Sequence, residues 1–115
     1  MTELALQACM DGHLAHAAMV YRLDEELGTH HGLSWADFVL LTALDAAAEA
    51  TLAKELARTL SMPASQLLLQ LLQLEKIGLV ERAADGTGKR SVKLRPQGRR
   101  LLREARDTAE NACVR

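Results

Sequence analysis

The spacing of apolar residues changes once along this chain of 115 residues, and the change limits the folds that it can adopt. Before Gly78 the apolar side chains recur at the spacing of a helix. After it, residues 79–82 and 90–94 are short extended segments, and the second alternates polar and apolar side chains. Asp85-Gly86-Thr87-Gly88 between them is a turn signal. The pattern therefore predicts a β-hairpin within an otherwise helical chain.

Helices are predicted on both sides of this hairpin. Ser34, with Asp37 three residues later, and Thr51 are the expected N-caps, while Gly28 and Gly78 are expected to end helices. In chain order the expected helices are residues 4–27, 34–48, 51–60 and 63–77, with a last helix that starts at Pro96. Leucine and alanine fill 41 positions and favour helices, whereas aromatic residues make up 3%. This composition argues against a β-sandwich or barrel and against an RNA binder that stacks bases on aromatic rings.

The order helix, helix, short helix, turn, helix, hairpin, helix predicts a winged helix-turn-helix, a mainly α fold with a small β-hairpin. A chain of 115 residues has the size of one domain, so we assign residues 1–115 to one domain. Residues 33–96 form its expected winged helix-turn-helix.

The first predicted helix is apolar on more than one side. One stripe consists of Leu14, Ala17, Ala18 and Tyr21. A second stripe consists of Val20, Leu23 and Leu27. Such a helix must be covered on more than one side, and a second subunit is the expected cover in so small a chain. We therefore predict a homodimer, with residues 1–30 as dimerisation segment and Leu14, Ala17, Ala18 and Tyr21 at its interface.

The formal net charge of −1 averages two opposed halves. Residues 1–50 carry one basic residue against eight acidic ones, and residues 51–115 carry thirteen against seven. Most of the excess lies in residues 82–106, where nine Lys and Arg accompany only Asp85 and Glu104. Such polarity indicates a face directed at a polyanion, and its alternative is a solvated basic helix.

The stretch of residues 56–67, Leu-Ala-Arg-Thr-Leu-Ser-Met-Pro-Ala-Ser-Gln-Leu, resembles the L-A-x-x-L-x-[LM]-x-x-S-x-[VL] pattern of the multiple-antibiotic-resistance regulator (MarR) family. Leu71, Leu74-Glu75 and residues 78–82, Gly-Leu-Val-Glu-Arg, continue it. Gly32-Leu33-Ser34 is similar to the opening of that family's second helix. The resemblance covers roughly residues 14–110 and rests on the joint order and spacing of these pieces. It implies a bacterial transcription factor that dimerises through both terminal regions, here residues 1–30 and 97–115.

The resemblance implies that the fourth helix enters the major groove of double-stranded DNA and that the hairpin reaches the minor groove. Ser65, Gln66, Leu69 and Gln73 are the expected exposed positions of that helix. The glutamines suit adenine edges, Leu69 suits thymine methyl groups, and Ser65 suits a phosphate. Lys89 or Arg90 is the expected hairpin contact, and phosphate contacts are expected from Lys93, Arg95, Arg99 and Arg100.

The fourth helix departs from the family, in which Thr and Arg often stand where this chain has Leu68 and Leu69. Leu67, Leu71 and Leu74 account for its buried side, so Leu68, Leu69 and Leu72 require another role. The alternatives are a leucine-rich core helix, apolar reading of DNA, or a protein-contact surface that has replaced DNA binding.

In the hairpin, Asp85 is the one acidic residue that could hold the basic tip by a salt bridge.

Other residues are candidates for ligand, metal or redox sites. Relatives bind small aromatic acids or phenols, and Tyr21, His30 and Trp35 are the residues expected to border such a cleft; core packing is the alternative. His13, His16, His30 and His31 are read as structural or solvated, so no metal and no other cofactor is expected. Cys9 lacks the basic neighbours of a reactive thiol.

No catalytic motif is present, so we expect no enzyme activity and no catalytic residues. The two cysteines imply no disulfide framework. The chain contains neither a secretory signal nor a membrane-spanning run. We therefore expect a cytoplasmic DNA-binding repressor without a membrane partner, and leave a small-molecule effector open.

Overall fold

The computed structural model describes residues 1–47 and 49–114 and divides them into two compact units. The terminal unit comprises Met1–Trp35 and the segment from Ala105 onward. The winged unit comprises Ala36–Glu104. The predicted end of the second helix at Ala48 lies outside the described residues.

The terminal unit contains helix α1, Thr2–His31, which is longer than the sequence predicted. It continues through Gly28 and ends at Gly32, whose backbone is left-handed with φ 69°. The predicted stop at Gly28 was wrong because a glycine inside a helix costs only about 1 kcal/mol, which burial of Leu23 and Leu27 offsets. Although α1 has 30 residues, no helix in the described part of the chain is long and apolar enough to cross a membrane.

Hydrogen bonds of Arg22 and His31 join α1 to the end of helix α5, Pro96–Cys113, within the terminal unit. The Nε of Arg22 donates to the Ala112 carbonyl oxygen at 2.9 Å. The Nε2 of His31 lies 2.8 Å from the Thr108 hydroxyl. The buried residues of this unit are Leu23, Leu27, Leu33, Ala105, Ala109 and Ala112. Small side chains at 105, 109 and 112 lie on one side of α5, which lets another backbone approach closely.

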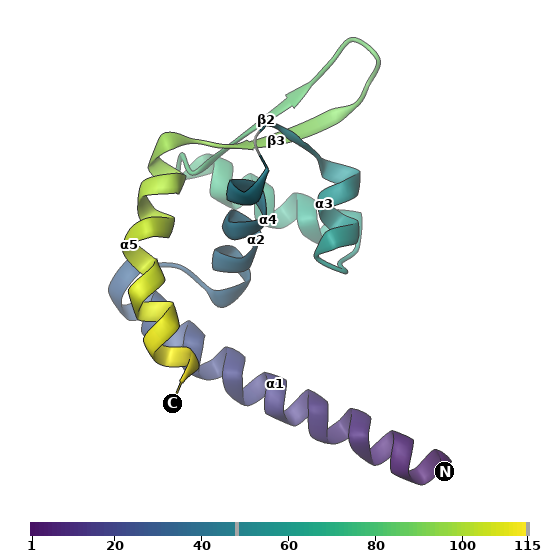
Figure 1. The fold of residues 1–115 in the computed structure, drawn as a ribbon. Coiled ribbons are helices and arrows are strands. Elements are labelled where there is room, and N and C mark those ends of the chain that lie inside the picture. The colour runs from purple at the N-terminus through teal and green to yellow at the C-terminus, as the bar shows by residue number, and fades with distance from the viewer. Residues whose placement is uncertain (48, 115) are drawn as a thin grey trace. The chain divides into compact units, whose positions relative to one another are not determined.

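The winged unit combines helices with one small sheet (Figure 1). Its elements are α2 (Trp35–Ala46), β1 (Thr51–Leu52), α3 (Ala53–Thr59), α4 (Ala64–Lys76), β2 (Val80–Ala84), β3 (Arg90–Leu94) and the start of α5. The predicted order of helices, turn and hairpin is confirmed, as is the start of the last helix at Pro96. The hairpin of β2 and β3 extends away from the helices of this unit.

The sheet has three antiparallel strands in the order β1-β3-β2. Val80 pairs with Leu94 across the hairpin, and Thr51 pairs with Val92 on the other side of β3. Thr51 was predicted as the N-cap of the third helix; it lies instead in a strand, and the helix starts at Ala53. A two-residue strand is too short to show alternation, so its pairing with β3 is decided by the tertiary structure.

The core of the winged unit is aliphatic. Its buried members are Leu40, Leu41, Leu44, Leu56, Ala57, Leu67, Leu71, Leu74, Leu79, Val80, Val92, Leu94 and Leu102. The predicted buried stripe of the fourth helix is therefore confirmed. Phe38 on α2 is only half-buried and does not belong to this core.

Candidate nucleic-acid interface

Helix α4 has a buried face and an exposed apolar face. Leu67, Leu71 and Leu74 are each 2% exposed. At about 100° per residue, Leu69 falls on the opposite side of the helix, and it is 65% exposed. Leu68 and Leu72 are also exposed. The leucines beyond the buried stripe thus lie at the surface of this chain rather than in its core.

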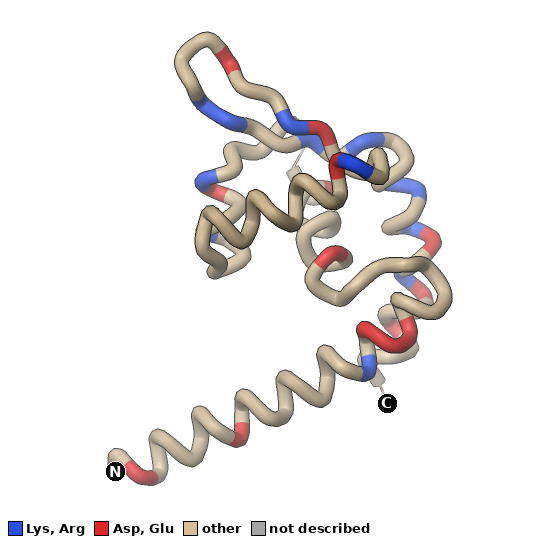
Figure 2. The backbone as a smooth tube through the Cα atoms, turned by 180° about the vertical axis from the view of Figure 1, so that it is seen from behind, with Lys and Arg blue, Asp and Glu red and all other residues tan. Residues whose placement is uncertain are grey.

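The polar residues of α4 divide between these faces. Ser65, Gln66 and Gln73 are exposed, as their positions predicted. Gln70 is half-buried, and its Nε2 donates to Asp37 Oδ1 at 3.0 Å, which ties α4 to α2. Figure 2 shows α4 without a charged residue until its end at Glu75 and Lys76. The exposed face of α4 therefore offers amides, a hydroxyl and leucine side chains.

The turn of the hairpin is organised by one carboxylate. Asp85 Oδ1 accepts hydrogen bonds from the backbone N–H groups of Thr87 (2.9 Å) and Lys89 (3.0 Å) and from the Thr87 hydroxyl (2.6 Å). Gly88 has φ 85°, a left-handed conformation that favours glycine. Asp85 was expected to hold the hairpin tip by a salt bridge; in the structure it caps the turn through these hydrogen bonds. These hydrogen bonds from Thr87 and Lys89 hold the pKa of Asp85 below its usual range.

The hairpin turn is expected to loosen when the pH is lowered through the folded-state pKa of Asp85. The carboxylate accepts these hydrogen bonds in its charged form, so its contribution is complete above the unfolded-state pKa and is lost as pH falls through the folded-state pKa. Amide hydrogen exchange at Thr87 and Lys89 should report this loss, after correction for intrinsic rates. Asp85→Ala should show about tenfold weaker protection of both amides at neutral pH. Protection that is equal in Asp85→Ala and the parent would contradict the role of the carboxylate.

A second carboxylate connects α4 to the hairpin. Glu75 Oε1 accepts a hydrogen bond from Arg82 Nε at 3.0 Å, and Glu75 Oε2 accepts one from the Arg82 backbone N–H at 3.3 Å. The Arg82 guanidinium and amide hold the pKa of Glu75 below its ordinary value. Because both carboxylate oxygens accept from one residue of β2, this pair fixes the hairpin against the end of α4.

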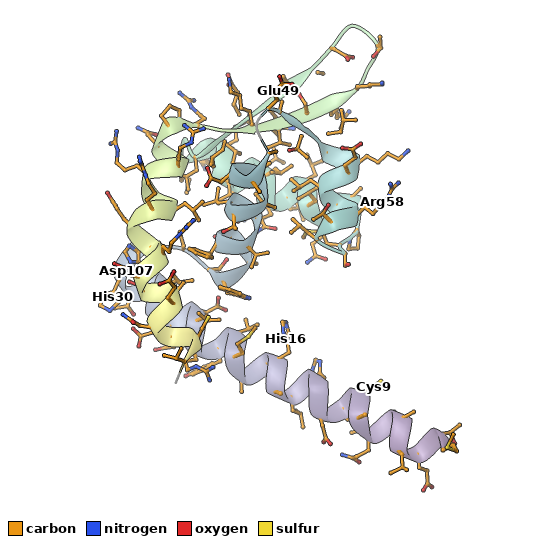
Figure 3. The ribbon with its side chains drawn as sticks, viewed as in Figure 1. Cys9, His16, His30, Glu49, Arg58 and Asp107 are labelled. Carbon is orange, nitrogen blue, oxygen red and sulfur yellow. The ribbon has the colours of Figure 1, made fainter. Side chains whose placement is uncertain are left out.

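A groove of about 1050 Å³ lies among the hairpin, α3 and the first half of α4. Apolar side chains that line it include Leu52, Ala57, Leu68, Leu71 and Val92. Its basic lining residues are Lys54, Arg58, Arg82, Lys89 and Arg90, against one acidic residue, Glu55. Arg58 projects outward from α3 in Figure 3. Since Arg82 is paired with Glu75, four exposed cations remain to attract an anion.

The groove brings together only part of the predicted DNA-binding set. Ser65, Lys89 and Arg90 line it. Gln66, Leu69 and Gln73 lie on the exposed face of α4, outside the lining. Lys93 and Arg95 are exposed but do not line the groove.

The register of the hairpin explains where Lys93 lies. Lys93 pairs opposite Glu81, whereas its neighbours Val92 and Leu94 are buried. Successive side chains of a strand point to opposite faces, so Lys93 lies on the outer face of the sheet. Arg99, a further predicted phosphate contact, lies 3.6 Å from Asp45 through its Nε.

Lys54 and Arg58 are groove residues that the sequence reasoning missed. The basic excess of the sequence lies in residues 82–106, whereas these two belong to a helix of only seven residues. A signal was present, because positions four apart share one face of a helix. That spacing places Lys54 and Arg58 together on α3.

The residues predicted for a ligand cleft lie in the terminal unit and do not line the groove. Tyr21 is 71% exposed and Trp35 is half-buried. The side chain of His30 is exposed, with its Nε2 3.7 Å from Glu26 Oε2. The backbone N–H of Trp35 donates to Asp24 Oδ1 at 2.7 Å. This hydrogen bond gives an acceptor to the backbone N–H of the first residue of α2.

The predicted dimer residues Leu14, Ala17, Ala18 and Tyr21 are all exposed on α1. Cys9 and His16 lie along the same helix in Figure 3, and both cysteines are exposed. Among residues 1–47 and 49–114, no group of three or more His, Cys, Asp or Glu side chains gathers as metal ligands would.

The chain matches no protein-family model, and no curated protein is similar to it in sequence. Solved structures share its fold. BldR, a transcriptional regulator from Sulfolobus solfataricus, is 26% identical with a TM-score of 0.83, over 96% of this chain and 79% of that one. Sco3205, a MarR-family transcriptional regulator from Streptomyces coelicolor in complex with DNA, is 22% identical with a TM-score of 0.83, over 96% of this chain and 69% of that one.

CouR from Rhodococcus jostii RHA1, bound to p-coumaroyl-CoA, has a TM-score of 0.77 at 22% identity, over 85% of this chain and 68% of that one. Many of the structures with this fold are MarR-family transcriptional regulators. The resemblance inferred from the sequence is therefore confirmed: the chain has the winged-helix fold of that family.

Proposed function

We propose that this protein is a sequence-specific DNA-binding transcriptional regulator, and that it acts as a homodimeric repressor. In this proposal α4 enters the major groove of double-stranded DNA and the β2–β3 hairpin enters the adjacent minor groove. The observation that carries it is the basic groove between these two elements, within a fold shared with a regulator in complex with DNA. No catalytic role, metal or cofactor is part of the proposal, and we expect action in the cytoplasm, where the DNA lies.

The charge of the groove suits the phosphate backbone that runs between a major and a minor groove. Lys54 and Arg58 on one side face the same groove as Lys89 and Arg90 on the other. All four are exposed, so they can exchange water and counterions for phosphate oxygens. Phosphate contacts of this kind set the position and affinity of a protein on DNA, while contacts to base edges set its specificity.

The homodimer is supported by the exposed apolar side chains of α1. Leu14 is 64% exposed and Tyr21 is 71% exposed, and Leu4, Leu6 and Met10 are also at the surface. A contiguous apolar surface on a helix indicates a protein contact. A second copy would cover it and would present two α4 helices to a pseudo-palindromic site.

A small-molecule effector that alters DNA affinity is a further part of the proposal. Its support is that CouR, which shares the fold, binds p-coumaroyl-CoA. Tyr21, His30 and Trp35 remain the proposed contacts.

Titration of duplex DNA of mixed sequence with this protein, followed by fluorescence anisotropy, tests the proposal. We expect binding at about 0.05 M salt that weakens steeply as salt rises. Four groove cations in each of two chains predict that log K falls against log[salt] with a slope of about −7. Saturation should require two chains per site. Absence of binding at the lowest salt, both to this duplex and to a pool of genomic DNA fragments, would overturn the proposal.

The alternative is that the protein has lost operator binding and contacts a protein partner through α4. The observation that favours it is the exposure of Leu68, Leu69 and Leu72 on one helix. The same titration separates the two functions, because the alternative predicts no salt-dependent binding of duplex DNA. Leu69→Arg then serves as a second discriminator: a protein that contacts a partner through α4 should lose its complex, whereas a DNA reader should keep or gain affinity for the duplex of mixed sequence.

A further inference from the structure

The outward face of α4 combines three side chains of restricted chemistry. Gln66, Leu69 and Gln73 lie at intervals of three and four residues and thus share one side of the helix. Leu69 is the most exposed leucine of α4, opposite the buried leucines. In the described part of the chain, neither Gln66 nor Gln73 has a side-chain hydrogen-bond partner, in contrast to Gln70, which is engaged with Asp37. The amides of Gln66 and Gln73 are therefore available to an external ligand.

This combination matches one kind of base pair. An adenine edge in the major groove offers N7 as acceptor and the N6 amino group as donor, which a glutamine amide satisfies with two hydrogen bonds. The thymine of the same pair presents a 5-methyl group, which an aliphatic side chain contacts. Guanine is read chiefly by Arg or Lys, and α4 has no charged residue from Ala64 to Leu74.

We propose that α4 reads a run of A·T pairs, with Gln66 and Gln73 on adenine edges and Leu69 on a thymine methyl group between them. This inference rests on the proposed function and names the sequence class that the regulator recognises. Residues 66 and 73 are seven positions apart, about 10 Å along the helix, which corresponds to about three base pairs. Each half-site therefore contains an A·T-rich block of about four base pairs, with Gln66 and Gln73 at its ends.

Selection of binding duplexes from a randomised pool by the full chain is the first test. We expect two A·T blocks whose centres are separated by about 10 base pairs or a multiple of that distance. Enrichment of G·C pairs at the centre of each half-site would overturn the inference while leaving the proposed function intact. Failure to retain any duplex at low salt would overturn both.

Replacement of thymine by deoxyuridine in the selected duplex is the second test, because it removes only the methyl group. One replacement in each half-site should weaken binding about tenfold, on the basis of about three- to fourfold per buried methyl group. Replacement of thymines outside the half-sites should have no effect. Equal affinity for the thymine and uracil duplexes would overturn the contact assigned to Leu69.

Two variants assign the methyl contact to a residue. Leu69→Ala should bind the thymine and uracil duplexes with the same affinity, since the side chain that senses the methyl group is gone. Ile77→Ala removes another exposed aliphatic side chain, 61% exposed and beyond the end of α4, and should keep the parental discrimination. Leu69→Arg should shift the selected pair at this position from A·T to G·C. Uracil discrimination that persists in Leu69→Ala would reject Leu69 as the reader.

Discussion

Replacement of Lys89 and Arg90 together by alanine is expected to lower the affinity for duplex DNA by about three orders of magnitude at about 0.1 M salt. Both side chains are exposed and line the groove at the end of the hairpin. Each lost phosphate contact reduces the slope of log K against log[salt] by about 0.9. A dimer that loses two contacts in each chain should therefore lose about 3.6 from this slope. Anisotropy titrations at several salt concentrations measure both the affinity and the slope.

Arg103→Ala combined with Arg106→Ala is the matched control for this prediction. These two cations belong to the same basic stretch of the sequence and are exposed, but they lie on α5 and do not line the groove. The control should keep most of the parental affinity and slope. Equal losses in the two double variants would mean that overall charge, rather than the groove, attracts the DNA. Because all four side chains are exposed, neither double variant should shift the unfolding temperature appreciably.

Gly98→Ala is expected to lower the free energy of unfolding by about 2–3 kcal/mol, although glycine to alanine usually stabilises a helix. Gly98 is buried in the first turn of α5. A Cβ at this position would overlap the Leu79 carbonyl oxygen and would lie 2.8 Å from Leu94 Cδ1. The Leu79 carbonyl also accepts a hydrogen bond from the Arg95 backbone N–H at 3.0 Å, so it cannot withdraw without losing that bond. Chemical denaturation of both proteins measures the difference.

Gly12→Ala is the control for the backbone contribution. Gly12 lies inside α1, and a Cβ there would meet no atom within 4 Å. This substitution should therefore stabilise the helix by up to about 1 kcal/mol. A Gly98→Ala variant that gains stability as Gly12→Ala does would contradict the close packing of α5 on Leu79.

The exposed face of α4 could be predicted from the sequence because helical spacing is a local property. Once Leu67, Leu71 and Leu74 are placed inward, Gln66 and Leu69 must lie outward. The groove could not be predicted from the sequence in the same way. It joins α3, α4 and the hairpin, whose residues are separated by tens of positions, so Lys54 and Arg58 reach the site only through tertiary packing.

The direction of side chains in β3 was likewise not predicted from the charge of the sequence. The burial of Val92 and Leu94 places Lys93 on the opposite face of the sheet, whereas the sequence predicted only that Lys93 contacts phosphate. The net charge of a segment records how many cations it has and not the direction in which they point. The pleat of the strand settles that direction.

The sequence by itself determined the helix–hairpin–helix order, the buried stripe of α4 and the turn at residues 85–88, because each depends on contacts between near neighbours in the chain. Only the tertiary structure decided three other features: α1 continues through Gly28, Thr51 joins β3 as a third strand, and Gly98 packs on Leu79. Each of these depends on a partner distant in sequence or on burial. Local propensities of about 1 kcal/mol or less are too small to resist the burial of leucine side chains and the pairing of a strand.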